Sequence, residues 1–295
     1  MSWHSEFPGM DSDKLSVIRR GIDAVFRGFT REYGEAIERL FDPLRDLLIH
    51  SEQLLTQSPW PAVIAAIAFV AWLGSRSWRI VLSTILTLLF IGYFGMWEDT
   101  MKTISIIFVS TLTALVLGLP IGIAMSRWDR LQNSISPVLD VMQTLPSFVY
   151  LIPVVMLLGI GRVAGLIAVV IYAIPPVIRF TSLGIRLVHK DLLEAADAFG
   201  SSTWQKMFHV QLPLALPTIM AGVNQTIMLS LAMVVIASMI GVQGLGQPVL
   251  KAIANQYFTM GMFNGLAIVG IAIIFDRVSQ TYGKRLQKHL EVVHG

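Results

Sequence analysis

The feature that most constrains this chain is a series of long segments without Asp, Glu, Lys or Arg. A membrane-spanning helix needs about 20 consecutive, mostly apolar residues, and seven segments approach or exceed that length. They lie at residues 53–75, 80–97, 103–126, 141–161, 163–178, about 214–241 and about 263–275. We therefore predict an all-α polytopic membrane protein with about seven spans.

The composition agrees with this class and excludes several functions. The 295-residue chain is 54% hydrophobic and only 14% charged, whereas soluble domains carry about 25% charged residues. It has no cysteine, which excludes a disulfide framework, a thiolate nucleophile and a Cys-ligated metal. Its six histidines never form a metal-ligand spacing, and we identify no Ser/His/Asp nucleophile set. We therefore expect no metal site and no catalytic residue in this chain.

Basic residues predict the orientation of the spans, because short cytoplasmic loops are enriched in Lys and Arg. With the N-terminus outside and the C-terminus inside, twelve of the basic residues after position 58 fall in cytoplasmic segments. Only Lys102, Arg162 and Lys251 then fall in external loops. The opposite orientation would invert the rule, so we predict an external N-terminus and a cytoplasmic C-terminus.

Charge divides the chain into three predicted regions. Residues 1–58 have a net charge of −3, and Leu15, Ile18, Ile22, Val25 and Phe29 recur in them at helical spacing. We predict an external amphipathic helical segment there, followed by a transmembrane domain at 59–281 and a basic cytoplasmic tail at 282–295. Two interpretations of the first segment stay open: it lies on the outer membrane interface, or it packs on the protein's own flank.

Several polar and flexible side chains lie inside the predicted spans, where an amide without a partner is costly. The candidates for a translocation pathway are Gln143, Asn224, Gln225 and Met228. Hydrogen bonding between helices is the alternative explanation for the amides. Prolines within the spans suggest broken helices around a cavity; they are Pro120, Pro146, Pro153, Pro175 and Pro176.

The segment 186–213 has the pattern of two short capped helices on the cytoplasmic side. Asp191 with Glu194, and Ser202 with Gln205, both have the spacing of a capping box. Gly200 is placed to end the first helix in a left-handed conformation, and Pro213 to stop the second. These features predict a helix–glycine–helix docking element, and a structured loop without a partner is the alternative.

The same segment carries a family resemblance. Glu194-Ala195-Ala196, then Gly200, then Val210-x-Leu212-Pro213 resembles the "EAA" loop of the permease subunits of binding-protein-dependent ABC importers, with Val210 in place of isoleucine. The resemblance implies a type I-like ABC importer transmembrane fold. It also implies that residues 186–213 form the coupling loop that docks on a cytoplasmic ATPase. The residues that carry the motif are Glu194, Ala195, Ala196, Gly200, Leu212 and Pro213.

Further segments are similar to a narrower group, the glycine betaine, proline betaine and choline permeases. They lie at 140–161, 173–179, 211–225 and 237–246. This resemblance implies ATP-driven import of a quaternary amine for osmoprotection, through the bacterial inner membrane. It implies three protein partners: a cytoplasmic ATPase, an external or periplasmic substrate-binding protein and a second copy of this chain. The lipid bilayer surrounds the assembly, and no nucleic acid is involved.

The chain has no phosphate-binding loop of the form G-x-x-x-x-G-K-[S/T]. We therefore expect it not to be an enzyme and to hold no cofactor, with ATP and magnesium bound by the partner ATPase. One alternative is an importer of the same design for an amino acid or a metal ion. A secondary transporter or channel that works without ATP, and a membrane anchor for a signalling complex, are further alternatives. The secondary transporter predicts inverted repeats and carboxylates inside the spans, and we find neither in the sequence.

Overall fold

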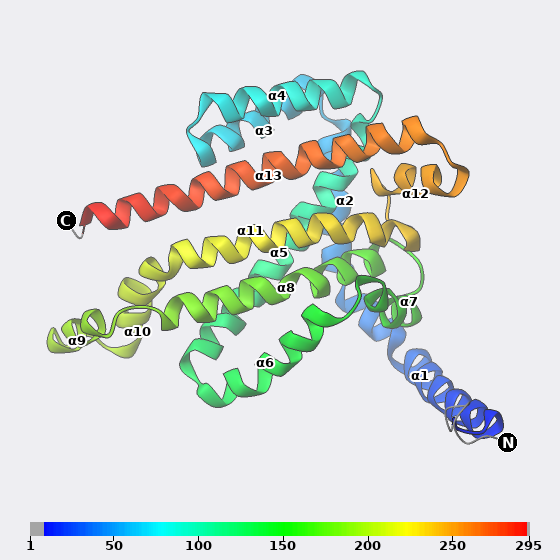
Figure 1. The fold of residues 1–295 in the computed structure, drawn as a ribbon, viewed down its shortest axis with the longest axis horizontal. Helices are drawn as coiled ribbons and strands as arrows, with labels where there is room; N and C mark the ends of the chain where they lie inside the picture. Colours follow the sequence, from blue (N-terminus) through cyan, green and yellow to red (C-terminus); the bar gives the residue numbers. More distant parts are fainter. Residues whose placement is uncertain (1–8, 294–295) are drawn as a thin grey trace, which may run out of the picture.

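The computed structural model describes residues 9–293, which form helices joined by short connections (Figure 1). The α-helices are α1 (Ser12–Leu40), α2 (Asp42–Gln57), α3 (Trp60–Ser75), α4 (Trp78–Tyr93), α5 (Trp97–Arg127), α6 (Asp129–Thr144), α7 (Leu151–Leu158), α8 (Arg162–Arg186), α9 (Lys190–Ala198), α10 (Thr203–Gln205), α11 (Leu212–Ala237), α12 (Gly246–Asn255) and α13 (Phe258–Val293). Short 3₁₀ segments lie at Ser147–Tyr150 and Ser238–Ile240, and a π-helical segment lies at Lys206–Gln211. The predicted all-α class is confirmed.

Helix α8 lies at the centre of the bundle, between α5 and α11. Among the long apolar helices it has the largest buried share, 67%. Small residues let its neighbours approach its backbone closely. A Cβ on Gly122 of α5 would lie 2.7 Å from the carbonyl oxygen of Ile178, and one on Gly222 of α11 would lie 3.3 Å from that of Pro176. Val109, Leu166 and Met233 fill the space between these three helices and are fully buried.

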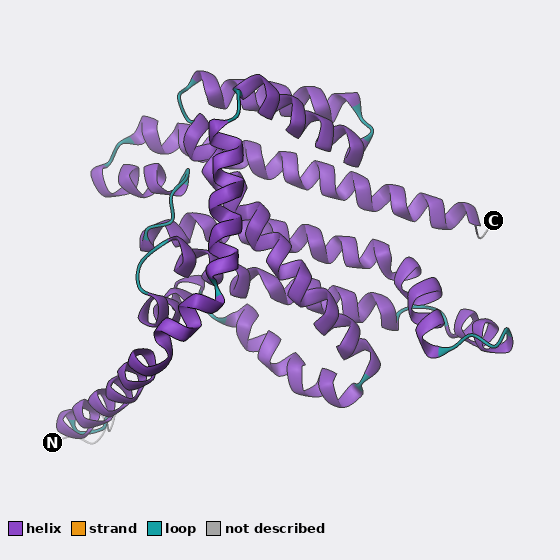
Figure 2. Cartoon of the chain, turned by 180° about the vertical axis from the view of Figure 1, so that it is seen from behind, coloured by secondary structure: helices purple, strands orange, loops and turns teal. Residues whose placement is uncertain are grey.

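The long helices alternate in direction along the long axis of the molecule (Figure 1). Helices α9 and α10 join α8 to α11 at one end, where the C-terminus also lies. Helix α12 joins α11 to α13 at the opposite end, where α1 and the N-terminus lie. Seen from behind, α2 crosses the bundle and only short loops join the helices (Figure 2).

The spans are less uniform than the sequence predicted. Four single helical runs are long and apolar enough to cross a membrane: α5, α8, Thr203–Ile240 and Phe258–Arg285. Two more crossings require a bent pair, α2 with α3 at 116° and α6 with Ser147–Leu158 at 112°. Helix α4 is apolar but has 16 residues, about 24 Å of helix. The predicted number seven is reached only by counting both bent pairs and α4.

Two of the predicted spans have to be corrected. The segment 53–75 is not one helix, because α2 ends at Gln57 and α3 begins at Trp60 after Pro59. The segment 141–161 is broken at Leu145-Pro146, where Leu145 is extended with ψ of 134°. A residue before proline is pushed out of the helical region by the proline ring. Both breaks therefore have the same local cause.

Of the five prolines predicted to interrupt spans, only Pro146 breaks one. Pro120 lies inside the continuous helix α5, and Pro175 with Pro176 inside the continuous helix α8. Pro153 lies within the short helix α7. Pro175 and Pro176 are buried against neighbouring helices, and such packing lets a membrane helix tolerate proline. The prediction of broken helices is right at Pro146 and wrong at the other positions.

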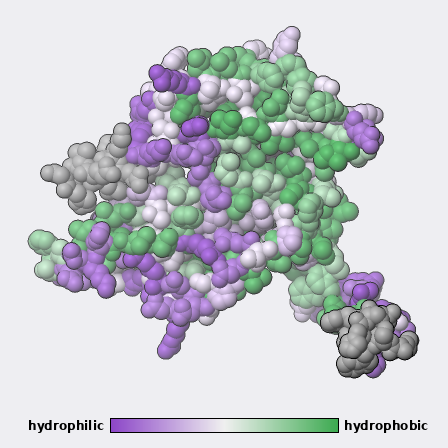
Figure 3. Space-filling model, viewed as in Figure 1, coloured by the Kyte–Doolittle hydropathy of each residue, from purple (hydrophilic) through white to green (hydrophobic). Residues whose placement is uncertain are grey.

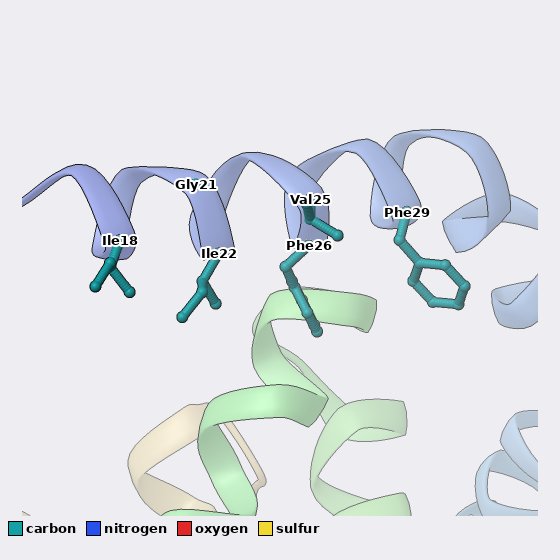
Figure 4. Close-up of a pocket in the computed structure, with 6 residues that line it drawn as sticks. All are labelled: Ile18, Gly21, Ile22, Val25, Phe26 and Phe29. Atoms are coloured by element: carbon teal, nitrogen blue, oxygen red, sulfur yellow. The ribbon is translucent and has the colours of Figure 1, made fainter.

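The first two helices differ in how they contact the bundle. Leu48 of α2 is buried in the main core, whereas α1 extends away from the bundle with its apolar residues on one face. Figure 4 shows Ile18, Ile22, Val25, Phe26 and Phe29 projecting from that face. Gly34 lies where α1 meets α7, since its added Cβ would be 3.7 Å from the carbonyl oxygen of Leu157. Helix α1 therefore touches the bundle near its C-terminal end and leaves most of its apolar face uncovered within the described chain.

Candidate functional site

The predicted docking element is a compact turn between two helices at one end of the molecule. Helix α9 ends at Ala198, and Gly200 follows with φ of +74°. The Gly200 amide donates to the Asp197 carbonyl at 2.9 Å, and the Ser201 amide to the Ala196 carbonyl at 3.0 Å. This pair of bonds is a Schellman motif, which satisfies carbonyls that the helix end leaves free. The predicted left-handed Gly200 is confirmed.

The second helix begins with the predicted capping box. The Gln205 amide donates to Ser202 Oγ at 3.3 Å, and the Ser202 amide donates to Gln205 Oε1 at 2.7 Å. From there the helix does not stop at Pro213. It continues through the π-helical segment Lys206–Gln211 into α11, in one run from Thr203 to Ile240. A π-turn changes the hydrogen-bond register just before Pro213, which has no N–H to donate.

Two contacts fix the angle of α9 against the span. Lys206 Nζ forms an ion pair with the Asp197 carboxylate, which joins the C-terminal end of α9 to the π-helical segment. Met207 is 1% exposed and packs with Ile185, Ala215 and Ile219. These apolar residues belong to α8 and α11, so the π-helical segment, which Lys206 links to α9, packs directly against the two central helices.

The residues predicted from the motif take different positions in the loop. Glu194 and Ala195 are exposed, whereas Ala196 is buried and Leu212 and Pro213 are partly buried. The capping box predicted at Asp191 and Glu194 is wrong. Helix α9 has His189 at its N-cap and no side-chain cap, so Asp191 lies within the first turn. Glu194 is the fifth residue of the helix, too far along it to cap its start.

Three exposed aromatic side chains were not predicted from the motif. Phe199, Trp204 and Phe208 are 91%, 70% and 54% exposed, and the last two stack with ring centroids 5.7 Å apart. Large apolar side chains clustered at a surface mark an interaction site. The aromatic residues at positions 204 and 208, one helical turn apart, were the available signal. We call Phe199, Trp204 and Phe208 the aromatic patch.

A polar network joins α11 to α13 in the half of the bundle nearer α9. Asn224 Nδ2 donates to Asp276 Oδ1 at 3.1 Å, and Gln280 Nε2 donates to the same oxygen at 2.6 Å. Ser279 Oγ donates to Asn224 Oδ1. These bonds agree with the alternative explanation for Asn224, which is hydrogen bonding between helices. Asp276 directly follows the predicted seventh span at 263–275 but lies inside the apolar run Phe258–Arg285, so the expectation of spans without carboxylates is wrong at this position.

A cavity of about 450 Å³ lies beside this network, between α8, α11 and α13. Phe180, Asn224, Gln225, Gln280 and Lys284 are among its lining residues. The structure thus brings the pathway candidates Asn224 and Gln225 together. Met228 is partly buried one turn further along α11, and Gln143 is exposed on α6; neither lines this cavity.

Charged and polar residues also mark the neighbouring helix α6. The Asp140 carboxylate of α6 pairs with the Arg179 guanidinium of α8. Gln143 and Thr144 are exposed on the same helix. In the space-filling view, hydrophilic side chains gather at the α9 side of the molecule and extend inward between apolar surfaces (Figure 3). We call the exposed side chains of Asp140, Gln143, Gln225 and Gln280 together the polar face.

A second ion pair lies at the opposite end of the bundle. Arg162, the first residue of α8, donates to Glu52 of α2 at 3.0 Å and to Gln243 Oε1 at 2.8 Å. Glu52 is only 15% exposed in its side chain. This contact holds α2 and the connection before α12 to the same end of the central helix.

A comparison with protein families matches the part of the chain that contains the loop 186–213 and the cavity. Residues 114–288 match the family model described as "Binding-protein-dependent transport system inner membrane component". The chain is 48% identical over 242 residues to the glycine betaine/proline betaine transport system permease protein ProW of Escherichia coli (strain K12). That match covers 82% of this chain and 68% of the relative. The chain is also 46% identical over 229 residues to the glycine betaine/carnitine transport permease protein GbuB of Listeria monocytogenes serotype 1/2a. That match covers 77% of this chain and 81% of the relative.

A solved structure is similar in fold. The methionine ABC transporter MetNI in an inward-facing conformation contains a chain that superposes with a TM-score of 0.57. The match covers 62% of this chain and 92% of that chain at 21% sequence identity. The likeness supports the arrangement of the central helices alone.

Proposed function

Because the chain belongs to the family of binding-protein-dependent transport system inner membrane components, we propose that it translocates glycine betaine as the membrane-spanning subunit of an ATP-driven importer. Membership makes it a multi-pass permease subunit of the inner membrane, and it implies an ATPase and a substrate-binding protein as partners. The choice of solute is the specific part of the proposal.

The choice of glycine betaine as the solute rests on the names of two similar relatives. Both are named for glycine betaine transport, and each is at least 46% identical over more than three quarters of this chain. The matched region includes the coupling loop and the central helices. Proline betaine and choline, which have the same methylated ammonium group, are the closest other substrates.

Energy enters through the partner ATPase, which holds ATP and magnesium, so this chain needs no cofactor of its own. The exposed residues Glu194 and Ala195 and the aromatic patch form the surface that docks on the ATPase. Closure of the ATPase around ATP displaces α9. The buried Met207 passes that displacement to α8 and α11, and the bundle opens outward to receive substrate from the binding protein.

The pathway lies between two copies of the chain. An exposed amide or carboxylate in contact with lipid is costly, and the polar face carries several such groups, with Gln225 and Gln280 on the apolar runs of α11 and α13. A second copy placed against this face gives a water-filled path lined by the same residues from both copies. The presence of one coupling loop per chain agrees with a pair of ATPases.

The basic residues set the orientation of the assembly. The loop 186–213 and the tail 282–295 lie in the cytoplasm, and residues 1–58 lie outside. Helix α1 then runs along the outer surface of the membrane, where lipid covers the apolar face that the described chain leaves open.

The test is isolation of the complex from native membranes with the chain affinity-tagged. An ATPase and a binding protein that co-purify, with the binding protein retaining labelled glycine betaine in preference to methionine, support the proposal. A binding protein that prefers an amino acid or a metal ion would contradict the solute and leave the family assignment intact.

A further inference from the structure

The cavity beside Asp276 is formed by two matched stripes of residues. On α13, Gln280 and Lys284 line the cavity at a spacing of four residues, and Asp276 lies one turn before Gln280 on the same helical face, behind the lining. On α11, Pro217, Ala221, Asn224 and Gln225 recur at helical spacing and line the cavity from the other side. Phe180 of α8 lines the cavity from a third helix, and its Cβ packs close to Gly222. The result is a groove in the half of the bundle nearer α9.

Asp276 determines which polar atoms face the groove. Its carboxylate accepts one N–H from Asn224 and one from Gln280. The bond from Gln280 uses one of its amide donors and leaves Gln280 Oε1 as an acceptor at the cavity, whereas Asn224 Oδ1 already accepts from Ser279 Oγ. The Asp276 carboxylate therefore lies directly behind the lining residues Asn224 and Gln280 and makes this wall negative in potential.

The two ends of the groove differ in charge. Gly283 lies level with Met220 on α11, where its added Cβ would be 3.4 Å from the Met220 Cβ. The neighbouring Lys284 is thus nearer the α9 end, whereas Phe180 lies level with Gly222, deeper in the bundle. The end of the groove deeper in the bundle therefore has the Phe180 ring and the negative wall. The end nearer α9 has the Lys284 ammonium group.

A betaine carries complementary groups. Its trimethylammonium has no N–H and is bound by aromatic faces and negative surroundings, and its carboxylate pairs with a lysine. We propose that this groove is an inner transit site for a zwitterionic betaine, with the methylated ammonium between Phe180 and the Asp276 wall and the carboxylate toward Lys284. This inference rests on the proposed function and adds the residues that select a zwitterion over a simple cation.

A steric variant tests whether substrate passes through the groove. Ala221 is exposed and lines the cavity, so Ala221→Trp fills the groove without displacing a buried side chain. In proteoliposomes that contain the complete complex, we expect ATP-driven uptake of labelled glycine betaine to fall about tenfold or more. Ala221→Ser keeps the groove open and retains parental uptake. Parental uptake by Ala221→Trp would contradict the proposal.

Chemical variants test how the site holds its ligand. The measurement is equilibrium binding of labelled glycine betaine to the permease–ATPase complex in phosphatidylethanolamine/phosphatidylglycerol nanodiscs, without the binding protein. We expect saturable binding that Phe180→Leu weakens about tenfold and Phe180→Tyr retains. Lys284→Gln weakens betaine binding and leaves choline binding unchanged, because choline has no carboxylate. Arg277→Gln, an exposed charge on the same helix outside the groove, changes neither.

The two proposals fail in different ways. A wild-type complex that does not import glycine betaine would overturn the proposed function. A wild-type complex that imports it but shows no saturable binding in nanodiscs would overturn only the transit site. So would saturable betaine binding that Lys284→Gln leaves unchanged.

Discussion

Gly200 shows how one residue sets the geometry of the loop 186–213. Its positive φ allows both Schellman bonds, and its added Cβ would have no neighbour within 4 Å. A substitution there is therefore costly through backbone strain alone and not through a clash. This position was predictable from the sequence because a helix end, a glycine and a following capping box are all local signals.

We predict that Gly200→Val uncouples the permease. A left-handed conformation costs a β-branched residue about 1–2 kcal/mol or more, so α9 tilts and no longer seats on the ATPase. Membrane insertion and protein level are unchanged, because Gly200 touches no span. ATP hydrolysis measured on the purified complex no longer responds to the loaded binding protein. Gly200→Asn, which tolerates this conformation, retains the response, and equal coupling in both variants would show that the turn has no role.

The aromatic patch leads to a second prediction at this scale. Trp204→Ala removes an exposed ring from the docking surface, and central aromatic anchors contribute about 2 kcal/mol or more to an interface. We expect the ATPase to bind the permease about 30-fold more weakly, measured by titration of ATPase onto permease in nanodiscs. Trp128→Ala is the matched control, since Trp128 is 62% exposed at the same end but outside the loop. A similar loss in both variants would refute a specific role for the patch.

At the scale of the helices, apolar length identified the segments, and local breaks determined their shape. Residues 103–126 and 163–178 were predicted because long apolar runs need no knowledge of neighbours, and both lie within single helices. The bend at Leu145-Pro146 was suggested by the proline, but the outcome depended on packing, since the buried Pro175 leaves α8 continuous. The hydrogen bond between Asn224 and Asp276 depends on how α11 is aligned along α13, and a single sequence does not reveal that alignment.

The contact between α2 and α8 gives a prediction about an element. Glu52→Gln removes the ion pair with Arg162, which is partly exposed, so the loss is about 1 kcal/mol or less. We expect hydrogen exchange of α2 amides to become about two- to fivefold faster, while exchange of α8 stays unchanged. The control is Glu98→Gln, which breaks the more exposed pair with Lys102 on α5. Unchanged exchange in α2 after Glu52→Gln would mean that apolar packing around Leu48 holds this helix alone.

At the scale of the whole molecule, the alternation of helix ends agrees with the charge pattern. Segments that carry the predicted cytoplasmic charges, such as the start of α6 and the end of α8, lie at the end where α9 lies. Helix α1 lies at the other end. The absence of cysteine from the sequence makes this arrangement simple to test by labelling.

We predict that Glu35→Cys reacts with a membrane-impermeant thiol reagent in intact spheroplasts. Glu35 is exposed on α1, which we place outside. Arg130→Cys, exposed at the start of α6, reacts only after the membrane is permeabilised. Mass spectrometry of the purified chain measures both labelling reactions. The reverse pattern would invert the orientation and remove the loop 186–213 from the ATPase.

The central claim is that this chain converts ATP hydrolysis by a partner into movement of a betaine across the membrane. Its most direct test is uptake of labelled glycine betaine into proteoliposomes that contain the chain, its ATPase and its binding protein, with ATP enclosed on the ATPase side. We predict accumulation against the betaine gradient that requires both ATP and the binding protein, and that persists when ion gradients are dissipated. Accumulation that follows an imposed ion gradient and is indifferent to ATP would contradict the account.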